Sequence, residues 1–108
     1  MSRLKVDSRL RKVCNHIYYQ PTEATRLQYP CILYEDQAPS SVFANNKRYR
    51  AIPSYRATVI VKEPDSKLNQ ELVDEFDPSI SYDTRYVSDN LYHTSWIIND
   101  DTGSNEPK

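Results

Sequence analysis

The sequence contains a single glycine, Gly103, so everything that precedes it must fold without this residue. Glycine-rich loops that cradle phosphates, such as the P-loop and the dinucleotide-binding loop, need a backbone approach that only glycine permits. The sequence therefore excludes those nucleotide sites. Turns must instead use asparagine, aspartate, serine and proline, which either tolerate a positive φ or preset φ. Clusters of these residues mark the ends of helices and strands.

A chain of 108 residues predicts one domain, which we place at residues 1–100, followed by a polar, disordered tail at 101–108. A domain of this size buries roughly two-thirds of the surface that its unfolded chain exposes. No apolar run approaches the roughly 20 residues of a membrane span. The N-terminus also lacks the apolar stretch of a signal peptide. We expect a protein made in a cytoplasm that does not enter a membrane.

The spacing of apolar residues predicts two helices and four strands. Apolar side chains of residues 3–17 recur at helical intervals, whereas those of residues 55–62 alternate as in a strand. A loop is expected over 36–47, which is rich in Pro, Ser and Asn, and a hairpin turn at 88–90. The predicted order is helix 3–17, strand 29–35, strand 49–63, helix 64–77, strand 79–87 and strand 91–98.

This α-β-β-α-β-β order predicts an α+β fold, a two-layer sandwich in which two helices cover one face of a four-stranded, mainly antiparallel sheet. The other face of the sheet would show tyrosine, arginine and threonine to solvent or to a partner.

Charge is sorted along the chain. Residues 1–62 hold eleven Lys and Arg against four Asp and Glu, a balance of +7, whereas residues 63–108 hold three against eleven, a balance of −8. Such asymmetry concerns partners rather than fold. Either the basic part of one copy meets the acidic part of another, or a basic face meets nucleic acid. We expect the first helix and the 36–47 loop to form a basic region. We expect it to lie opposed to an acidic region formed by the second helix and the tail.

Sequence motifs for catalysis or metal binding are weak. Cys14 and His16 lack a second ligand pair at a suitable spacing, and Cys31 and His93 could form one only by converging in the fold, which the sequence leaves open. No local motif supports a cysteine or serine nucleophile. Acidic residues of the second helix fit a solvated face. We therefore expect no enzyme activity, no cofactor and no metal, and two buried thiols rather than a disulfide.

One stretch alternates basic and aromatic residues, as single-strand-binding sheets do. Lys47, Arg48, Arg50 and Arg56 interleave with Tyr49 and Tyr55. The isoelectric point near 6.1 is low for a dedicated nucleic-acid-binding protein. Single-strand binding therefore stays a minor alternative.

Several segments of the chain form an ordered set: 17–21 with Glu23, Tyr29–Tyr34, Ala44–Lys47, 58–60 with 64–66, and Asp83, Tyr86 and 89–93. Taken together, they resemble a family of small tailed-bacteriophage proteins of the tail-terminator or tail-completion type. At Asp83 the family pattern continues with Arg, whereas here Thr84 follows and Arg85 comes next.

The resemblance implies a structural, non-enzymatic virion protein with an α+β fold, assembled in the host cytoplasm and located at the head–tail junction. Members form a hexameric ring that caps the tail tube and meets the neck, with the lumen as the path for DNA. The expected partners are therefore further copies of the chain, the tail tube protein and a neck or head-closure protein. A neck or head-closure adaptor is the alternative role.

Within this interpretation, the 36–47 loop is the first candidate for reaching an adjacent subunit, and the exposed face of the sheet is the second. Acidic residues of the second helix are further interface candidates. Arg48, Arg50 and Arg56 are the candidates for facing DNA. The candidate interface residues are Phe43, Asn45, Asn46, Lys47, Arg48, Arg50, Glu71, Asp74 and Glu75.

Overall fold

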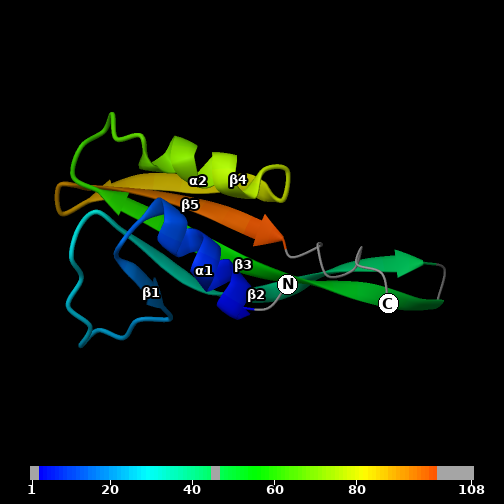
Figure 1. The fold of residues 1–108 in the computed structure, drawn as a ribbon. Helices are drawn as coiled ribbons and strands as arrows, with labels where there is room; N and C mark the ends of the chain where they lie inside the picture. Colours follow the sequence, from blue (N-terminus) through cyan, green and yellow to red (C-terminus); the bar gives the residue numbers. More distant parts are fainter. Residues whose placement is uncertain (1–2, 45–46, 100–108) are drawn as a thin grey trace.

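The computed structural model describes residues 3–44 and 47–99, with side chains for 3–37 and 53–99. Two helices and five strands follow one another along this part of the chain (Figure 1). They are α1 (Arg3–Val13), β1 (Ile17–Tyr19), β2 (Cys31–Ala44), β3 (Lys47–Val61), α2 (Leu68–Phe76), β4 (Ile80–Ser88) and β5 (Leu91–Asn99).

The strands form one sheet in the order β1-β2-β3-β5-β4. Only β1 and β2 run parallel, and the other three neighbouring pairs are antiparallel. Both helices pack on the same face (Figure 1) and share one core with it. The predicted α+β sandwich is confirmed, but the sheet has five strands rather than four. The additional strand is β1, which was not predicted.

Three rows of side chains cross the face that the helices cover. The first joins Ile17, Ile32, Val59 and Thr94, and the second joins Tyr19, Tyr34, Ala57, Trp96 and Tyr82. The third contains Tyr55, Ile98 and Ile80. Side chains alternate between the faces of a strand, so Tyr55, Ala57, Val59 and Val61 of β3 all enter this core, as predicted. The helices add the buried residues Val6, Leu10, Leu68, Leu72 and Phe76.

The first helix is shorter than predicted, and this error hid a strand. α1 ends at Val13, whereas Ile17 lies in β1 opposite Ile32. Cys14 and Ile17 are both buried, so the apolar spacing continues past the helix although the backbone has changed. Three residues of parallel pairing with β2 favour the extended conformation there, and local periodicity carries no signal for such long-range pairing.

The predicted loop at 36–47 is wrong: β2 and β3 continue as a two-stranded ribbon, which we call the arm (residues 38–44 and 47–52). It pairs through positions such as Ser40 with Ile52 and Ala44 with Lys47. Pro39 and Pro53 both lie between the Gln37–Ser54 and Ser40–Ile52 pairs, where the register shifts. Proline is tolerated at such an irregularity because no ladder hydrogen bond is lost. A composition typical of loops therefore sits in an extended ribbon.

The second hairpin forms as predicted, although its turn contains no glycine. Ser88 pairs with Leu91, which leaves the two-residue loop Asp89-Asn90. Both residues have positive φ, 54° and 63°, as a type I′ turn requires. Asparagine and aspartate tolerate this region better than other non-glycine residues, so the turn does not need the missing glycine.

The two helices are joined at the end of α2. Arg9 of α1 donates from Nε to Glu75 Oε2 at 2.9 Å and from a terminal nitrogen to the Glu75 carbonyl oxygen. Its guanidinium also lies 4.4 Å from the centre of the Phe76 ring. The last turn of α2 contains no basic residue of its own, so Arg9 supplies the positive charge that a helix C-terminus favours.

A polar network fastens α1 to β2 through the buried Tyr34. The Tyr34 hydroxyl accepts from Arg3 at 3.1 Å and donates to Asp7 Oδ2 at 2.6 Å. Asp7 also accepts from Arg11 at 2.6 Å. Burial and the hydrogen bond to Asp7 raise the pKa of Tyr34 to about 12. Burial disfavours the ionised Asp7, but the hydrogen bonds from Tyr34 and Arg11 outweigh it and hold the Asp7 pKa below its ordinary 3.8.

Substituting Tyr34→Phe should lower the free energy of unfolding by about 1–3 kcal/mol, because it removes a buried hydroxyl that bridges two charged groups. The measurement is urea denaturation at pH 7. The stability linked to a depressed carboxyl pKa is present above the unfolded-state value and is lost as pH falls through the folded-state value. The parent should therefore lose stability below about pH 4 more steeply than the variant. Parallel pH profiles would contradict this role of Asp7.

Substituting Arg9→Ala should cost about 1–2 kcal/mol, since one change removes an ion pair, a helix C-terminal contact and a cation–π contact. Lys12→Ala removes an exposed cation of the same helix and should change stability by less than about 0.5 kcal/mol. Chemical denaturation of the two variants side by side tests the comparison. Equal effects would mean that the Arg9 contacts do not stabilise the helix pair.

Candidate functional site

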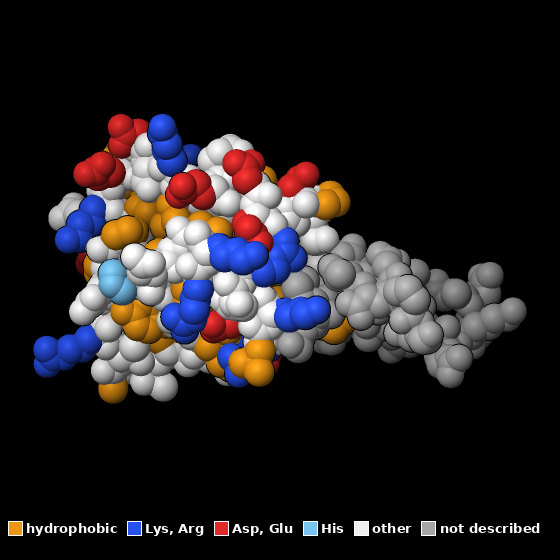
Figure 2. All heavy atoms as spheres, in the orientation of Figure 1, with side chains coloured by type: hydrophobic (Ala, Val, Ile, Leu, Met, Phe, Trp, Pro, Cys, Tyr) orange, Lys and Arg blue, Asp and Glu red, His pale blue; other side chains and the backbone are white. Residues whose placement is uncertain are grey.

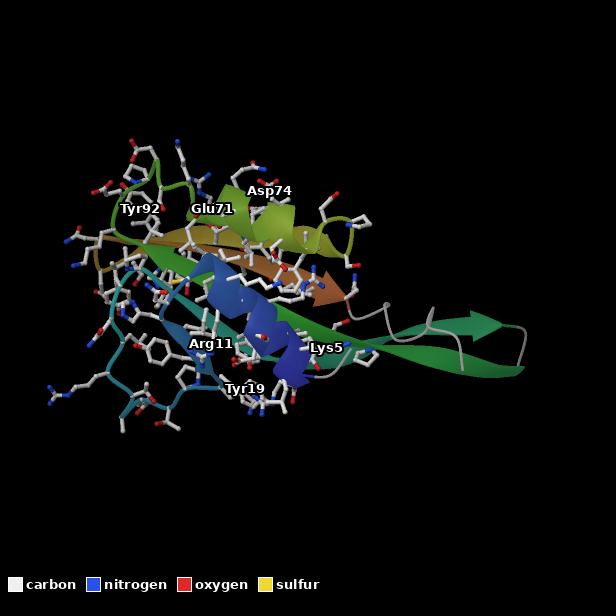
Figure 3. The ribbon with its side chains drawn as sticks, in the orientation of Figure 1. Lys5, Arg11, Tyr19, Glu71, Asp74 and Tyr92 are labelled. Carbon is white, nitrogen blue, oxygen red and sulfur yellow. The ribbon has the colours of Figure 1, made fainter. Side chains whose placement is uncertain are left out.

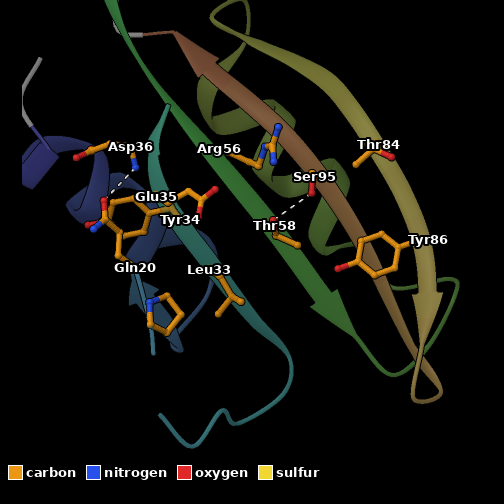
Figure 4. Close-up of a pocket in the computed structure, with 11 residues that line it drawn as sticks. Gln20, Leu33, Tyr34, Glu35, Asp36, Arg56, Thr58, Thr84, Tyr86 and Ser95 are labelled. Atoms are coloured by element: carbon orange, nitrogen blue, oxygen red, sulfur yellow. Dashed lines mark hydrogen bonds between the residues drawn. The ribbon is translucent and has the colours of Figure 1, made fainter. Parts of the chain in front are cut away.

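The face of the sheet opposite the helices carries a hollow of about 600 Å³ (Figure 4). Its floor is one row of paired residues across four strands: Leu33, Thr58, Ser95 and Thr84. Three of the four carry short hydroxyl side chains, and the Thr58 and Ser95 hydroxyls lie 3.1 Å apart in a hydrogen bond. Short side chains in the middle of a twisted sheet leave space that longer neighbours surround, and this produces the hollow.

The row on one side of this floor is charged. Glu35 of β2 is paired in register with Arg56 of β3. Nε of Arg56 lies 3.3 Å from Asp83 Oδ2, an ion pair with both side chains partly exposed. The Nε atom itself is buried and meets Asp83 as an ion pair rather than as an aligned hydrogen bond, whereas the Arg56 side chain as a whole is partly exposed. The hollow thus presents one guanidinium with spare donor capacity, close to two carboxylates.

The bulge in β4 places two consecutive residues, Asp83 and Thr84, on this face. Pairing with β5 shifts between Tyr82 and Thr84, which leaves Asp83 without an opposite residue. Tyr82 packs on the helix side, edge-on to Trp96 with ring centres 5.7 Å apart, whereas Thr84 lies on the floor of the hollow. A bulge commonly re-aims a side chain in this way. Here it puts Thr84 on the floor beside Asp83, whose carboxylate meets Arg56.

The row on the other side is aromatic. Tyr86 of β4 stacks on His93 of β5, with ring centres 4.5 Å apart and planes 9° from parallel. Tyr86 is 51% exposed. The wall beside β2 comes from the connection 20–30, where Gln20 and Pro21 line the hollow. Gln20 has a φ of 43° and accepts the Asp36 backbone N–H through its side-chain oxygen.

The structure places the predicted interface residues in two separate regions. Asn45 and Asn46 lie outside the described residues. Phe43, Lys47, Arg48 and Arg50 belong to the arm, where only the backbone is described.

The three acidic candidates lie on α2. Glu71 and Asp74 are exposed, whereas Glu75 is paired with Arg9 of the same subunit. Glu75 therefore contributes to the fold.

The basic and acidic helices are neighbours rather than opposed surfaces. Asp and Glu side chains gather over α2 in Figure 2, and Lys and Arg gather over the adjacent α1. Figure 3 shows Lys5 and Arg11 on α1 and Glu71 and Asp74 on α2. The Arg9–Glu75 pair joins these surfaces, so part of the charge asymmetry cancels within one subunit. The expectation of two opposed charged regions is wrong for the helices.

The basic–aromatic stretch of β3 is divided between the two faces of the sheet. Tyr55 is only 7% exposed and belongs to the helix-side core, so it offers no surface for a base to stack on. Arg56 lies on the open face (Figure 4). Strand alternation separates consecutive residues in this way, and it removes one of the two tyrosines from the predicted single-strand-binding surface.

Both cysteines are buried free thiols. Burial raises the pKa of the Cys31 thiol to about 12, with a smaller contribution from Cys14 nearby. Cys14 points to the carbonyl oxygens of His16 and Pro30, at 3.7 and 3.6 Å. Within the described part of the chain, no three His, Cys, Asp or Glu side chains gather closely enough to hold a metal ion. None of the helices in this part is both long and apolar enough to span a membrane.

Sequence reasoning anticipated Arg56 on the open face but missed the hollow around it. Thr58, Ser95 and Thr84 come from three strands and meet only through strand order and register. Thr84 reaches this face only through a bulge that no local pattern marks. The one sequence pattern that pointed to the hollow was the alternation of β3, which predicted that Arg56 and Thr58 lie on the same face of the sheet.

Comparison with protein-family models and with curated proteins finds no match to this chain.

The buried thiols give a direct check of the fold. The thiolate is the reactive form, and both burial and a raised pKa suppress it. In native protein at pH 8, Cys31 should resist a thiol-reactive disulfide reagent, whereas both cysteines should react after unfolding in urea. Rapid modification of two thiols per native chain would contradict the burial of Cys31.

Proposed function

We propose that this chain is a structural subunit of the head–tail junction of a tailed bacteriophage, where copies form a ring that terminates the tail tube and joins it to the neck. The proposal combines the ordered family resemblance of residues 17–98 with one structural observation, the arm. A hexamer is the stoichiometry that the resemblance implies. DNA would pass through the lumen without sequence-specific contacts.

The arm carries the structural part of the proposal. The pairing of β1 with β2 ends at Tyr34, and the pairing of β5 with β3 ends at Ser54. In the described backbone, the two strands of the arm therefore pair only with each other. Figure 1 shows them continuing past β5 and the helices. Seven residues of strand span roughly 23 Å. A two-stranded ribbon is marginally stable alone in water. A neighbouring subunit would give the ribbon a surface to pack on.

The surface charges also suit association between copies. Exposed cations of α1 and exposed carboxylates of α2 occupy adjacent parts of one face. Opposite charges on neighbouring subunits steer their encounter and disfavour wrong registers. Such an interface weakens with salt, so assembly should decrease as ionic strength rises.

The arm can be removed without touching the core. A variant in which Asp-Asn replaces residues 38–53 would join Gln37 to Ser54 through the turn that the chain already uses between Ser88 and Leu91. We expect it to unfold cooperatively in urea like the parent but to lose ring formation in multi-angle light scattering, and to lose binding to purified tail tubes.

The matched control replaces Asp89-Asn90 by Asn-Gly, which is another two-residue hairpin turn, and leaves the arm intact. It should assemble like the parent. A parent that stays monomeric at all concentrations and does not bind tail tubes would refute the proposed function. Copurification with DNA-filled heads instead of tails would favour the neck or head-closure adaptor.

A further inference from the structure

We infer that the hollow on the open face is the receptor for the arm of a second copy of this chain, so that each subunit inserts its arm into the hollow of the next. This inference rests on the proposed function and specifies its subunit contact. The receptor consists of the floor Leu33, Thr58, Ser95 and Thr84 with its charged row of Glu35, Arg56 and Asp83.

The shape of the hollow suits an extended segment. Side-chain rows flank the floor row at two residues' distance along each strand, so they are four residues apart, roughly 13 Å. Between them the hydroxyls of Thr58 and Ser95 satisfy each other, and Thr84 is exposed. A strand can lie in this space and leave the hydrogen bonds of the sheet intact.

The charges of Glu35, Arg56 and Asp83 determine which kind of segment can bind in the hollow. The Nε–H of Arg56 faces Asp83, but the side chain is 39% exposed, so its terminal nitrogens can donate to the backbone carbonyls of an incoming strand. Glu35 is exposed and has no ion-pair partner among the described residues, so it favours a cation. The sequence at the end of the arm holds Lys47, Arg48 and Arg50. Two carboxylates next to the single guanidinium disfavour a phosphate backbone, so a basic strand fits better than nucleic acid.

The positions of arm and hollow give the right kind of contact for a ring. Both are built from β2 and β3. The end of β2 and the start of β3 form the arm, whereas Leu33, Glu35, Arg56 and Thr58 from the other parts of these strands line the hollow. A contact between two different patches is heterologous, and repeating it produces a closed ring or a filament, whereas a contact between identical patches stops at a dimer.

Charge reversal tests the pairing. Glu35→Lys places a cation opposite the basic arm, and Arg48→Glu places a carboxylate opposite Glu35. Each variant alone should assemble at least about tenfold more weakly than the parent, a change typical of one interfacial charge pair. A mixture of the two should recover assembly, because alternating subunits present an attractive pair at every contact. Glu63→Lys makes the same charge change outside the hollow and should assemble like the parent.

Cysteine crosslinking tests the direction of the contact. A variant with Ala44→Cys at the arm and Thr84→Cys on the floor should give, on mild oxidation, a ladder of covalent oligomers on a denaturing gel. Either substitution alone, or Ala44→Cys combined with Glu71→Cys on α2, should give no ladder. Covalent dimers without larger species, or equal crosslinking in the α2 control, would overturn the inference.

The failure of this inference differs from the failure of the proposed function. If the parent forms rings but the reversals, the mixture and the crosslinks have no effect, the arm does not occupy the hollow, although the ring function stands. If the parent neither assembles nor binds tail tubes, both fail. Saturable binding of a single-stranded oligonucleotide that Arg56→Glu abolishes, without a crosslinked ladder, would assign the hollow to nucleic acid and overturn the inference.

Discussion

The pairing of β3 with both β2 and β5 is the interaction on which the rest of the structure depends. This one strand contributes Tyr55, Ala57, Val59 and Val61 to the core under the helices. Its alternate residues Arg56 and Thr58 line the hollow on the other face, and its N-terminal part forms half of the arm. Because strand periodicity is two, a slip of one residue would exchange these faces. The core, the hollow and the arm are therefore fixed by one register.

That register also explains which features sequence reasoning could predict. The alternation of β3, the apolar stripe of α2 and the turn at Asp89-Asn90 are local patterns, and all three are confirmed. β1 depends on parallel pairing between residues fifteen apart, Ile17 and Ile32, which no local pattern encodes. The arm was misread because proline, serine and asparagine favour loops, whereas a register shift in the hairpin accommodates both prolines. Long-range pairing overrode local propensity in both cases.

The charge asymmetry has a similar explanation. Sorted along the sequence, it suggested separate basic and acidic surfaces, but the chain brings α1 beside α2 and joins them through Arg9 and Glu75. Part of the opposite charge thus stabilises the helix layer of a single subunit. The remaining exposed charges on α1 and α2 stay available to partners (Figure 2).

The two faces of the sheet differ in what they bury, and this explains why one holds the core and the other the hollow. The helix side encloses an apolar core and ties it with the Tyr34 and Arg9 contacts, so it is complete within one chain. On the open side, the partly exposed guanidinium of Arg56 lies beside a floor of hydroxyls. Its terminal nitrogens can donate to carbonyl oxygens of a partner. The arm is a ribbon whose described backbone pairs only with itself. A single heterologous contact between copies would engage both the guanidinium and the arm, and it would do so at every junction of a closed ring.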